Sequence, residues 1–219
     1  MKVSILMLTY NAPRYVKKSI QTLKKNTEGI DYELIVVDNA SEEKTKKLLN
    51  KLKEKGMIDK LVFNDKNELF AGGNNIAAKY ADKDADFYLL LNSDVKIKNK
   101  NWLKRLVDLH SGRGISSYGA VLSEPVRADG YCLLINKDLY DAHQLDEEFQ
   151  WWWSVTKLEA EILNEGNKII AVRNHENYIH HYGGKSGKGF KDASGLYPDM
   201  DKVKAWFKSG KVEILDTYE

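Results

Sequence analysis

Apolar and polar positions form blocks along the first 95 residues that predict strands and helices in alternation. Residues 3–8 are apolar apart from Ser4, which is typical of a strand covered on both faces. Pro13 stands where a helix can begin, and apolar residues then recur at helical spacing. The blocks that follow are a strand at 33–37, a helix with Ser41 as its N-cap, a strand at 60–63, a helix at 71–80 and a strand at 87–91. This order predicts right-handed crossovers and a doubly wound, mostly parallel α/β sheet with helices on both faces.

The strict alternation ends after Asp94. Gly166 closes the last predicted helix, and residues 180–189, rich in Gly, Lys and His, predict a mobile loop. We expect one domain of residues 1–219 with a functional division near residue 95. The other expected elements are a helix at 102–110, strands at 115–122 and 131–135, an acidic loop at 145–149 and a helix at 155–163.

Composition limits the class of protein. With 42% hydrophobic and 11% aromatic residues among 219, the chain can form a globular core. Lys and Arg number 34 against 32 Asp and Glu, and this near balance argues against a nucleic-acid binder. Cys132 is the only cysteine, which excludes an internal disulfide and a cysteine-cluster zinc site. No apolar run approaches the roughly 20 residues of a membrane span and no export signal is present, so we expect a soluble, cytoplasmic protein.

Polar side chains follow each of the first four predicted strands, at the sheet edge where function gathers in such folds. Turn chemistry accounts for any one of them. All four strand ends, however, carry amide, hydroxyl or carboxylate groups in place of Gly, Pro or Lys. The residues concerned are Thr9, Asn11, Asp38, Asn39, Asn64, Asn92 and Asp94.

Two of these segments have chemistry suited to a phosphate-bearing ligand. Asn92-Ser93-Asp94 can present hard oxygen ligands to Mg²⁺ or Mn²⁺, and such an ion would bridge diphosphate oxygens. Residues 71–75 open a helix with small side chains that allow close approach. No dinucleotide fingerprint follows the first strand and no phosphate-binding loop occurs, which argues against a redox enzyme and a P-loop kinase.

Four segments in order carry a family resemblance: VSILMLTYN at 3–11, LIVVDNAS at 34–41, FAGGNN at 70–75 and LLLNSD at 89–94. Together they resemble the family 2 glycosyltransferases, which are inverting enzymes of the GT-A fold that use nucleotide-diphosphate sugars. The resemblance continues through residues 130–135, the acidic loop and the helix that ends at Gly166. It implies a nucleotide-sugar-binding half at about 1–95 and an acceptor half at about 96–219.

The resemblance assigns the donor site to the strand ends. The donor would be a UDP-, dTDP- or GDP-sugar. Thr9, Tyr10 and Asn11 would wrap the nucleotide, and Asp38 would bind the base or ribose. The other substrate contacts implied are Asn39, Asn64, Ala71, Gly72, Gly73, Asn75, Asn92 and Ser93.

The resemblance also implies a metal cofactor, Mn²⁺ or Mg²⁺, with Asp94 as its expected ligand. The family motif is usually Asp-x-Asp, and the neutral Asn92 at its first position is a weaker ligand. His180 and His181 resemble a late histidine that holds the metal or the diphosphate, and the sequence leaves open which of them does so. Lys185 could neutralise diphosphate charge.

The acceptor half departs from the family. Relatives open the helix after the acidic loop with Glu-Asp, which supplies the general base. Counted back from Gly166, that pair falls on Ser154 and Val155, and neither can act as a base. The substitutes that the sequence offers are Asp129, Asp146, Glu147 and Glu148.

Three tryptophans directly precede this position. Rings of Trp151, Trp152 and Trp153 could line an acceptor platform, because aromatic faces favour the C–H faces of sugars. A buried pair with one partly exposed ring, or a contact with a partner subunit, accounts for them equally well.

The leading hypothesis is a metal-dependent hexosyltransferase of glycan biosynthesis, acting on a glycan or another hydroxyl acceptor with inversion. A degenerate relative that binds nucleotide sugar or glycan without efficient turnover is the alternative. A sugar nucleotidyltransferase is disfavoured, because no Gly-rich loop with Arg or Lys follows the first strand.

Overall fold

The computed structural model describes residues 1–110, 112–185 and 195–217. Its centre is an eight-stranded sheet in the order β12-β10-β6-β9-β4-β1-β2-β3. The strands of this sheet are β1 (Lys2–Thr9), β2 (Asp31–Asp38), β3 (Lys60–Phe63), β4 (Phe87–Leu91), β6 (Gly114–Tyr118), β9 (Cys132–Asn136), β10 (Lys168–Val172) and β12 (Glu213–Leu215).

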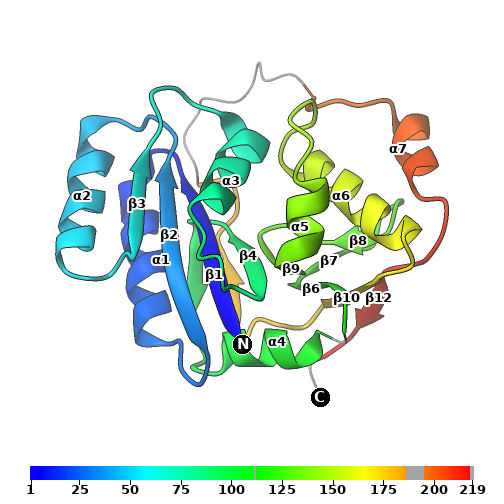
Figure 1. Cartoon of the computed structure of the whole chain (residues 1–219), viewed down its shortest axis with the longest axis horizontal. Coiled ribbons are helices and arrows are strands. Elements are labelled where there is room, and N and C mark those ends of the chain that lie inside the picture. Colours follow the sequence, from blue (N-terminus) through cyan, green and yellow to red (C-terminus); the bar gives the residue numbers. More distant parts are fainter. Residues whose placement is uncertain (111, 186–194, 218–219) are drawn as a thin grey trace.

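The sheet is mostly parallel, as the alternation of elements predicts. Only β9 runs antiparallel, between β4 and β6. In the parallel part β1, β2 and β3 run upward in Figure 1, and the register places Thr9 beside Asp38. The polar residues after these strands therefore meet at one edge. The predicted fold class is confirmed, whereas the functional division near residue 95 stays a prediction.

Helices cover both faces of the sheet because alternate strand residues are apolar on each side. One core joins Val3, Ile5 and Met7 of β1 to α1, α2 and α4. The other joins the opposite face to α3, α5 and α6, which lie in front of the sheet in Figure 1. The helices are α1 (Pro13–Lys25), α2 (Glu43–Glu54), α3 (Leu69–Lys79), α4 (Trp102–Leu109), α5 (Lys137–His143), α6 (Trp152–Asn164) and α7 (Met200–Trp206).

Three local predictions are corrected. The strand expected at 115–122 breaks at Gly119, whose φ of +107° turns the chain into β7 (Ala120–Val121). Glu42 and not Ser41 is the N-cap residue of α2, and the Ser41 hydroxyl accepts from the Asn11 amide at 2.7 Å. Part of the expected loop is a strand, since β11 (Ile179–His181) pairs with β5 (Val95–Ile97). Residues 186–189 of that loop lie outside the described residues.

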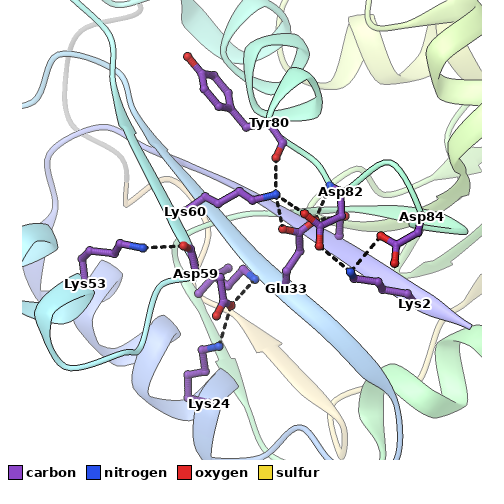
Figure 2. A network of polar contacts seen from close by, with 11 residues as sticks. Lys2, Lys24, Glu33, Lys53, Asp59, Lys60, Tyr80, Asp82 and Asp84 are labelled. Carbon is purple, nitrogen blue, oxygen red and sulfur yellow. Dashed lines mark hydrogen bonds and ion pairs between the residues drawn. The ribbon is translucent and has the colours of Figure 1, made fainter.

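A polar network ties the end of the sheet opposite those strand ends (Figure 2). Glu33 of β2 is buried, pairs with Lys60 of β3 at 2.8 Å and accepts from the Ser4 hydroxyl of β1 at 2.5 Å. Asp82 joins the same network through ion pairs with Lys60 and Lys2. Hydrogen bonds from these two lysines lower the pKa of Asp82 to about 2. The network therefore fixes three neighbouring strands at the end away from the polar edge.

Within the described residues, no helix has the length and apolar character needed to cross a membrane.

Candidate active site

A cavity of about 240 Å³ opens where β1 and β4 end. Nine residues singled out from the sequence line it, which places the expected site at the expected edge. These nine are Tyr10, Asn39, Asn92, Ser93, Asp94, Asp129, Trp151, Trp152 and His181. Further lining residues are Leu8, Asn67, Leu69, Phe70, Asn74, Leu90, Leu91, Gly130, Tyr131, Val155 and Gly184.

Asp94 and His181 form the polar centre of the cavity. The imidazole Nε2 of His181 lies 3.2 Å from Asp94 Oδ1 and 3.4 Å from the side-chain nitrogen of Asn92. Burial opposes ionisation of Asp94, but the hydrogen bond and charge of His181 outweigh it and lower the pKa of the carboxyl. A carboxylate, an imidazole and an amide thus converge on one point.

The short pairing of β5 with β11 brings this cluster together. Its antiparallel register sets His181 opposite Val95, the residue after Asp94. The Tyr182 amide donates to the Asp94 carbonyl at 3.0 Å, and the Lys185 amide donates to the Asp94 carboxylate at 3.2 Å. Lys185 therefore contacts the cluster through its backbone.

His180 takes no part in the cluster. Its Nδ1 lies 3.1 Å from Glu176, and its ring packs edge-on against Tyr182. Successive side chains of a strand point to opposite faces, so only one of the two histidines can face Asp94. The geometry answers the question that the sequence leaves open: the histidine beside Asp94 is His181.

The ring of Tyr131 stacks on that of His181, a contact that the sequence analysis does not predict. The two rings stack with centroids 4.3 Å apart and planes 11° apart. The Tyr131 hydroxyl contacts His175 Nε2 at 2.5 Å, and His175 Nδ1 contacts the Val172 carbonyl at 3.0 Å. If Nδ1 carries the proton that Val172 accepts, Nε2 is left to accept from Tyr131.

Polar residues at the ends of β1 and β2 hydrogen-bond with one another and with the chain that follows β2. Asp38 is fully buried and accepts from the Thr9 hydroxyl at 3.1 Å and the Ser41 amide at 2.9 Å. Asn11 accepts from the Glu42 amide at 2.9 Å. Thr9, Asn11 and Asp38 do not line the cavity, whereas Tyr10 does.

Asn39, the residue after β2, lines the cavity and is held by two hydrogen bonds. Its amide nitrogen donates to the Leu69 carbonyl at 2.9 Å, and its oxygen accepts from Asn64 at 2.8 Å. Asn64 therefore lies behind Asn39 and does not line the cavity itself. Leu69 has a φ of +57° although it is not glycine, and such strain is common at functional sites.

The small residues of α3 serve packing more than ligand approach. Ala71, Gly72, Gly73 and Asn75 are buried and do not line the cavity. Two amides of the first helical turn, those of Phe70 and Ala71, donate to the Gln150 side-chain oxygen at 3.1 and 3.3 Å. Within the stretch 71–75 Asn74 lines the cavity, as does Phe70 before it, and the contact of the other residues with substrate stays a prediction.

Of the three consecutive tryptophans, two line the cavity and the third packs elsewhere. Trp151 and Trp152 line the cavity, and Trp152 is 51% exposed. Trp151 adopts a φ of +49°. Trp153 turns away: its indole nitrogen donates to the Leu196 carbonyl at 2.9 Å, and the Arg127 guanidinium lies 5.5 Å from its ring. Two of the three rings are thus placed to meet a ligand.

The sequence of this chain matches a known protein family. A profile of "Glycosyl transferase family 2" matches residues 4–129, which is more than half of the chain. The chain belongs to glycosyltransferase family 2. It is 32% identical to an uncharacterized glycosyltransferase of Haemophilus influenzae over 105 residues, which is 48% of this chain and 40% of that protein. It is 27% identical over 110 residues to one of Mycoplasma pneumoniae, covering 50% of this chain and 36% of that protein. The matches therefore span less than half the length of these relatives.

Solved glycosyltransferases share the fold. The mannosyltransferase PcManGT of Pyrobaculum calidifontis, in complex with GDP-Man and Mn²⁺, aligns with a TM-score of 0.61 at 16% identity over 71% of this chain and 51% of its own. S. aureus TarS in complex with UDP aligns with a TM-score of 0.58 at 21% identity over 73% of this chain and 55% of its own. At such identities the likeness shows the GT-A fold.

Ser154 and Val155, which the family resemblance places at the position of the base, carry no carboxylate. Ser154 is fully buried in the first turn of α6, and its hydroxyl donates to the Trp151 carbonyl at 2.8 Å. Val155 lines the cavity. The two side chains cannot accept a proton from a substrate, as the sequence predicts.

The four substitute carboxylates are placed differently. Asp146 is bound by Lys157, and Glu147 accepts from the Asn75 amide at 3.1 Å. The Glu148 side chain is exposed and does not line the cavity. Only Asp129 of the four lies on the cavity wall.

Proposed function

We propose that this chain transfers a hexosyl group from a nucleotide-diphosphate sugar to a hydroxyl acceptor, with inversion and with a divalent metal ion. The proposal is carried by the convergence of Asp94, His181 and Asn92 on the cavity wall at the carboxyl ends of the strands. Membership of the family supports the reaction class.

The donor atoms of this cluster fit a divalent ion. Asp94 offers a carboxylate oxygen and His181 an imidazole nitrogen, and the Asn92 amide, whose nitrogen lies beside His181, would turn its oxygen toward the ion. Within the described ranges no group of three or more Asp, Glu, His or Cys side chains is arranged to hold a metal, so diphosphate oxygens and water would complete the shell. The ion, Mn²⁺ or Mg²⁺, would supply charge neutralisation for the departing diphosphate. Mn²⁺ in the mannosyltransferase neighbour favours manganese as the first ion to test.

The rest of the cavity suits a nucleotide and a sugar acceptor. Tyr10 and Phe70 offer rings and Asn67 an amide, which suit the base of a UDP, dTDP or GDP donor. Trp151 and Trp152 offer apolar faces, on which a glycan or another hydroxyl acceptor would stack. Stacking would orient the acceptor oxygen toward the sugar carbon that is attacked.

A second function is favoured by one observation. Ser154 and Val155 stand where relatives carry Glu-Asp, so the chain could bind a nucleotide sugar or glycan without efficient turnover. Release of nucleoside diphosphate from a bound donor separates the two functions. The transferase releases it catalytically, and the binding protein does not.

Thermal stability in the presence of nucleotides tests the donor site. UDP, dTDP and GDP are each added with Mn²⁺, with Mg²⁺ and with EDTA. A nucleotide at 100 times its Kd is expected to stabilise the protein by about 2.7 kcal/mol, a rise of a few degrees in Tm, when metal is present. Asp94→Ala should abolish the rise.

Asp108→Ala is the matched control, because Asp108 is a carboxylate of α4 that pairs with exposed Lys104. It should keep the full rise. If none of the nucleotides raises Tm with either metal, the proposed donor site is wrong.

A further inference from the structure

Two carboxylates line the cavity among the described residues, and they differ in what engages them. Asp94 is held by His181 and by the Lys185 amide. The Asp129 carboxylate has no hydrogen bond or ion pair with any described residue. It is half-buried and opens on the same cavity. Arg127 interacts with it through charge alone, so its oxygens are open to a ligand in the cavity.

The backbone of Asp129 is held firmly. Its amide donates to the Gly119 carbonyl at 2.9 Å, and its carbonyl accepts from the Ser117 hydroxyl at 2.7 Å. Gly119 leaves room for the side chain, since a Cβ there would lie 2.9 Å from that of Asp129. The preceding strand β8 (Arg127–Ala128) is tied to α6, because the Ala128 amide donates to Glu159 at 2.9 Å.

The turn that carries Asp129 faces the position where the family base is missing. The next residue, Gly130, packs against Val155 so closely that a Cβ would lie 2.8 Å from Val155 Cγ2. Val155 occupies the second position of the Glu-Asp pair, and both Val155 and Asp129 line the cavity. The first turn of α6 offers no carboxylate at this contact, whereas Asp129 stands on its other side.

We propose that Asp129 is the general base of this enzyme. The turn before β9 would supply this carboxylate, whereas in relatives the start of the helix that corresponds to α6 supplies it. The inference rests on the proposed function. The acceptor oxygen forms its bond to the sugar C1 as its proton passes to the Asp129 carboxylate. The bond from C1 to the diphosphate oxygen breaks, and its electron pair leaves with the nucleoside diphosphate. One base on the face opposite the leaving group is sufficient for inversion.

The test separates proton transfer from donor binding. Wild type and Asp129→Asn are assayed for release of nucleoside diphosphate from UDP-GlcNAc and GDP-mannose with Mn²⁺, with water as the acceptor. Titration with UDP and Mn²⁺ measures nucleotide affinity. We expect kcat to fall at least about a hundredfold, with nucleotide Kd unchanged within about twofold. The acid limb of the wild-type rate-against-pH profile should be absent in the variant.

Rival carboxylates and folding are checked in parallel. Asp146→Asn, Glu147→Gln and Glu148→Gln should keep the wild-type rate within about threefold, and Asp129→Ser repeats the test if Asp129→Asn does not fold. Wild-type turnover in both Asp129 variants, or loss in a rival variant alone, overturns the assignment. Wild-type protein that binds UDP with Mn²⁺ but releases no nucleotide also overturns it. Failure of wild type to bind any nucleotide overturns the proposed function itself.

Discussion

The imidazole of His181 lies 3.2 Å from the Asp94 carboxylate, although 87 positions separate the two residues in the chain. A three-residue strand, β11, makes this approach by pairing with the strand that follows Asp94. The neighbouring His180 points the other way, toward Glu176. Two adjacent histidines thus have separate environments, which makes them a matched pair for mutation.

His181→Ala should weaken binding of Mn²⁺ in the presence of UDP by at least about tenfold. The substitution removes the imidazole and leaves the Asp94 carboxylate as the remaining strong ligand of the cluster. His180→Ala should change it by less than about twofold. Electron paramagnetic resonance of free Mn²⁺ during a titration measures both. Equal losses in the two variants would contradict the assignment of His181 to the metal side.

Tyr131 should act on the same cluster through its ring. Tyr131→Leu removes the surface on which His181 stacks, and we expect Mn²⁺ affinity with UDP to fall by about ten- to a hundredfold, as for other groups that orient metal ligands. Tyr131→Phe keeps the ring and loses only the bond to His175, so its affinity should stay within about threefold. Like losses in both variants would assign the effect to the hydroxyl.

The first four strands of the sheet could be predicted because each is an apolar block followed by a polar turn. The pairing of β5 with β11 could not, since three-residue strands carry no periodicity and their partners lie more than 80 positions apart. The break at Gly119 was missed for a related reason. Gly119 has a φ of +107°, and its carbonyl accepts from the Asp129 amide ten residues later, a pairing that the sequence pattern does not reveal.

The site was predictable in part. Asp94 is predicted because the turn after a buried strand can present hard oxygen ligands, and His181 because it is one of two adjacent histidines that resemble a late histidine of the family. Tyr131 was interpreted as one more apolar residue of a strand, since its contacts with His181 and His175 depend on how distant segments pack. The sequence does not reveal that the Asp38 carboxylate accepts from Thr9 and from the Ser41 amide, or that Asn11 accepts from the Glu42 amide. The contact of these residues with a nucleotide stays a prediction.

Glu159 should make stability depend on pH. Burial raises the pKa of this carboxyl from 4.5 to about 8, and its Oε1 has no hydrogen-bond partner among the described residues. Between these pH values the folded state holds a proton that the unfolded state has released. Stability should therefore fall as pH rises from about 5 to 8, by about 1.4 kcal/mol for each unit of pKa difference.

Glu159→Gln should remove this part of the slope, because an amide does not titrate. Urea unfolding at several pH values measures it. Glu54→Gln, at an exposed glutamate of α2, is the control and should keep the wild-type slope. A wild-type slope retained in Glu159→Gln would show that the carboxyl titrates normally.

Gly72 and Gly73 should respond in opposite ways to alanine. A Cβ on Gly72 would meet Glu68 and Glu147 at ordinary contact distances of 3.4 Å or more, and alanine favours a helix over glycine by about 1 kcal/mol. A Cβ on Gly73 would lie 2.4 Å from Leu8 Cδ1 and 3.2 Å from the Asn39 amide nitrogen, so α3 or Leu8 must move. Such overpacking costs about 1–3 kcal/mol. Gly72→Ala should therefore be more stable than Gly73→Ala by roughly that amount in urea unfolding.

Because Leu8 and Asn39 line the cavity, Gly73→Ala should also weaken UDP binding while Gly72→Ala leaves it unchanged. Equal stability and affinity in the two variants would mean that α3 does not pack on β1 as closely as described.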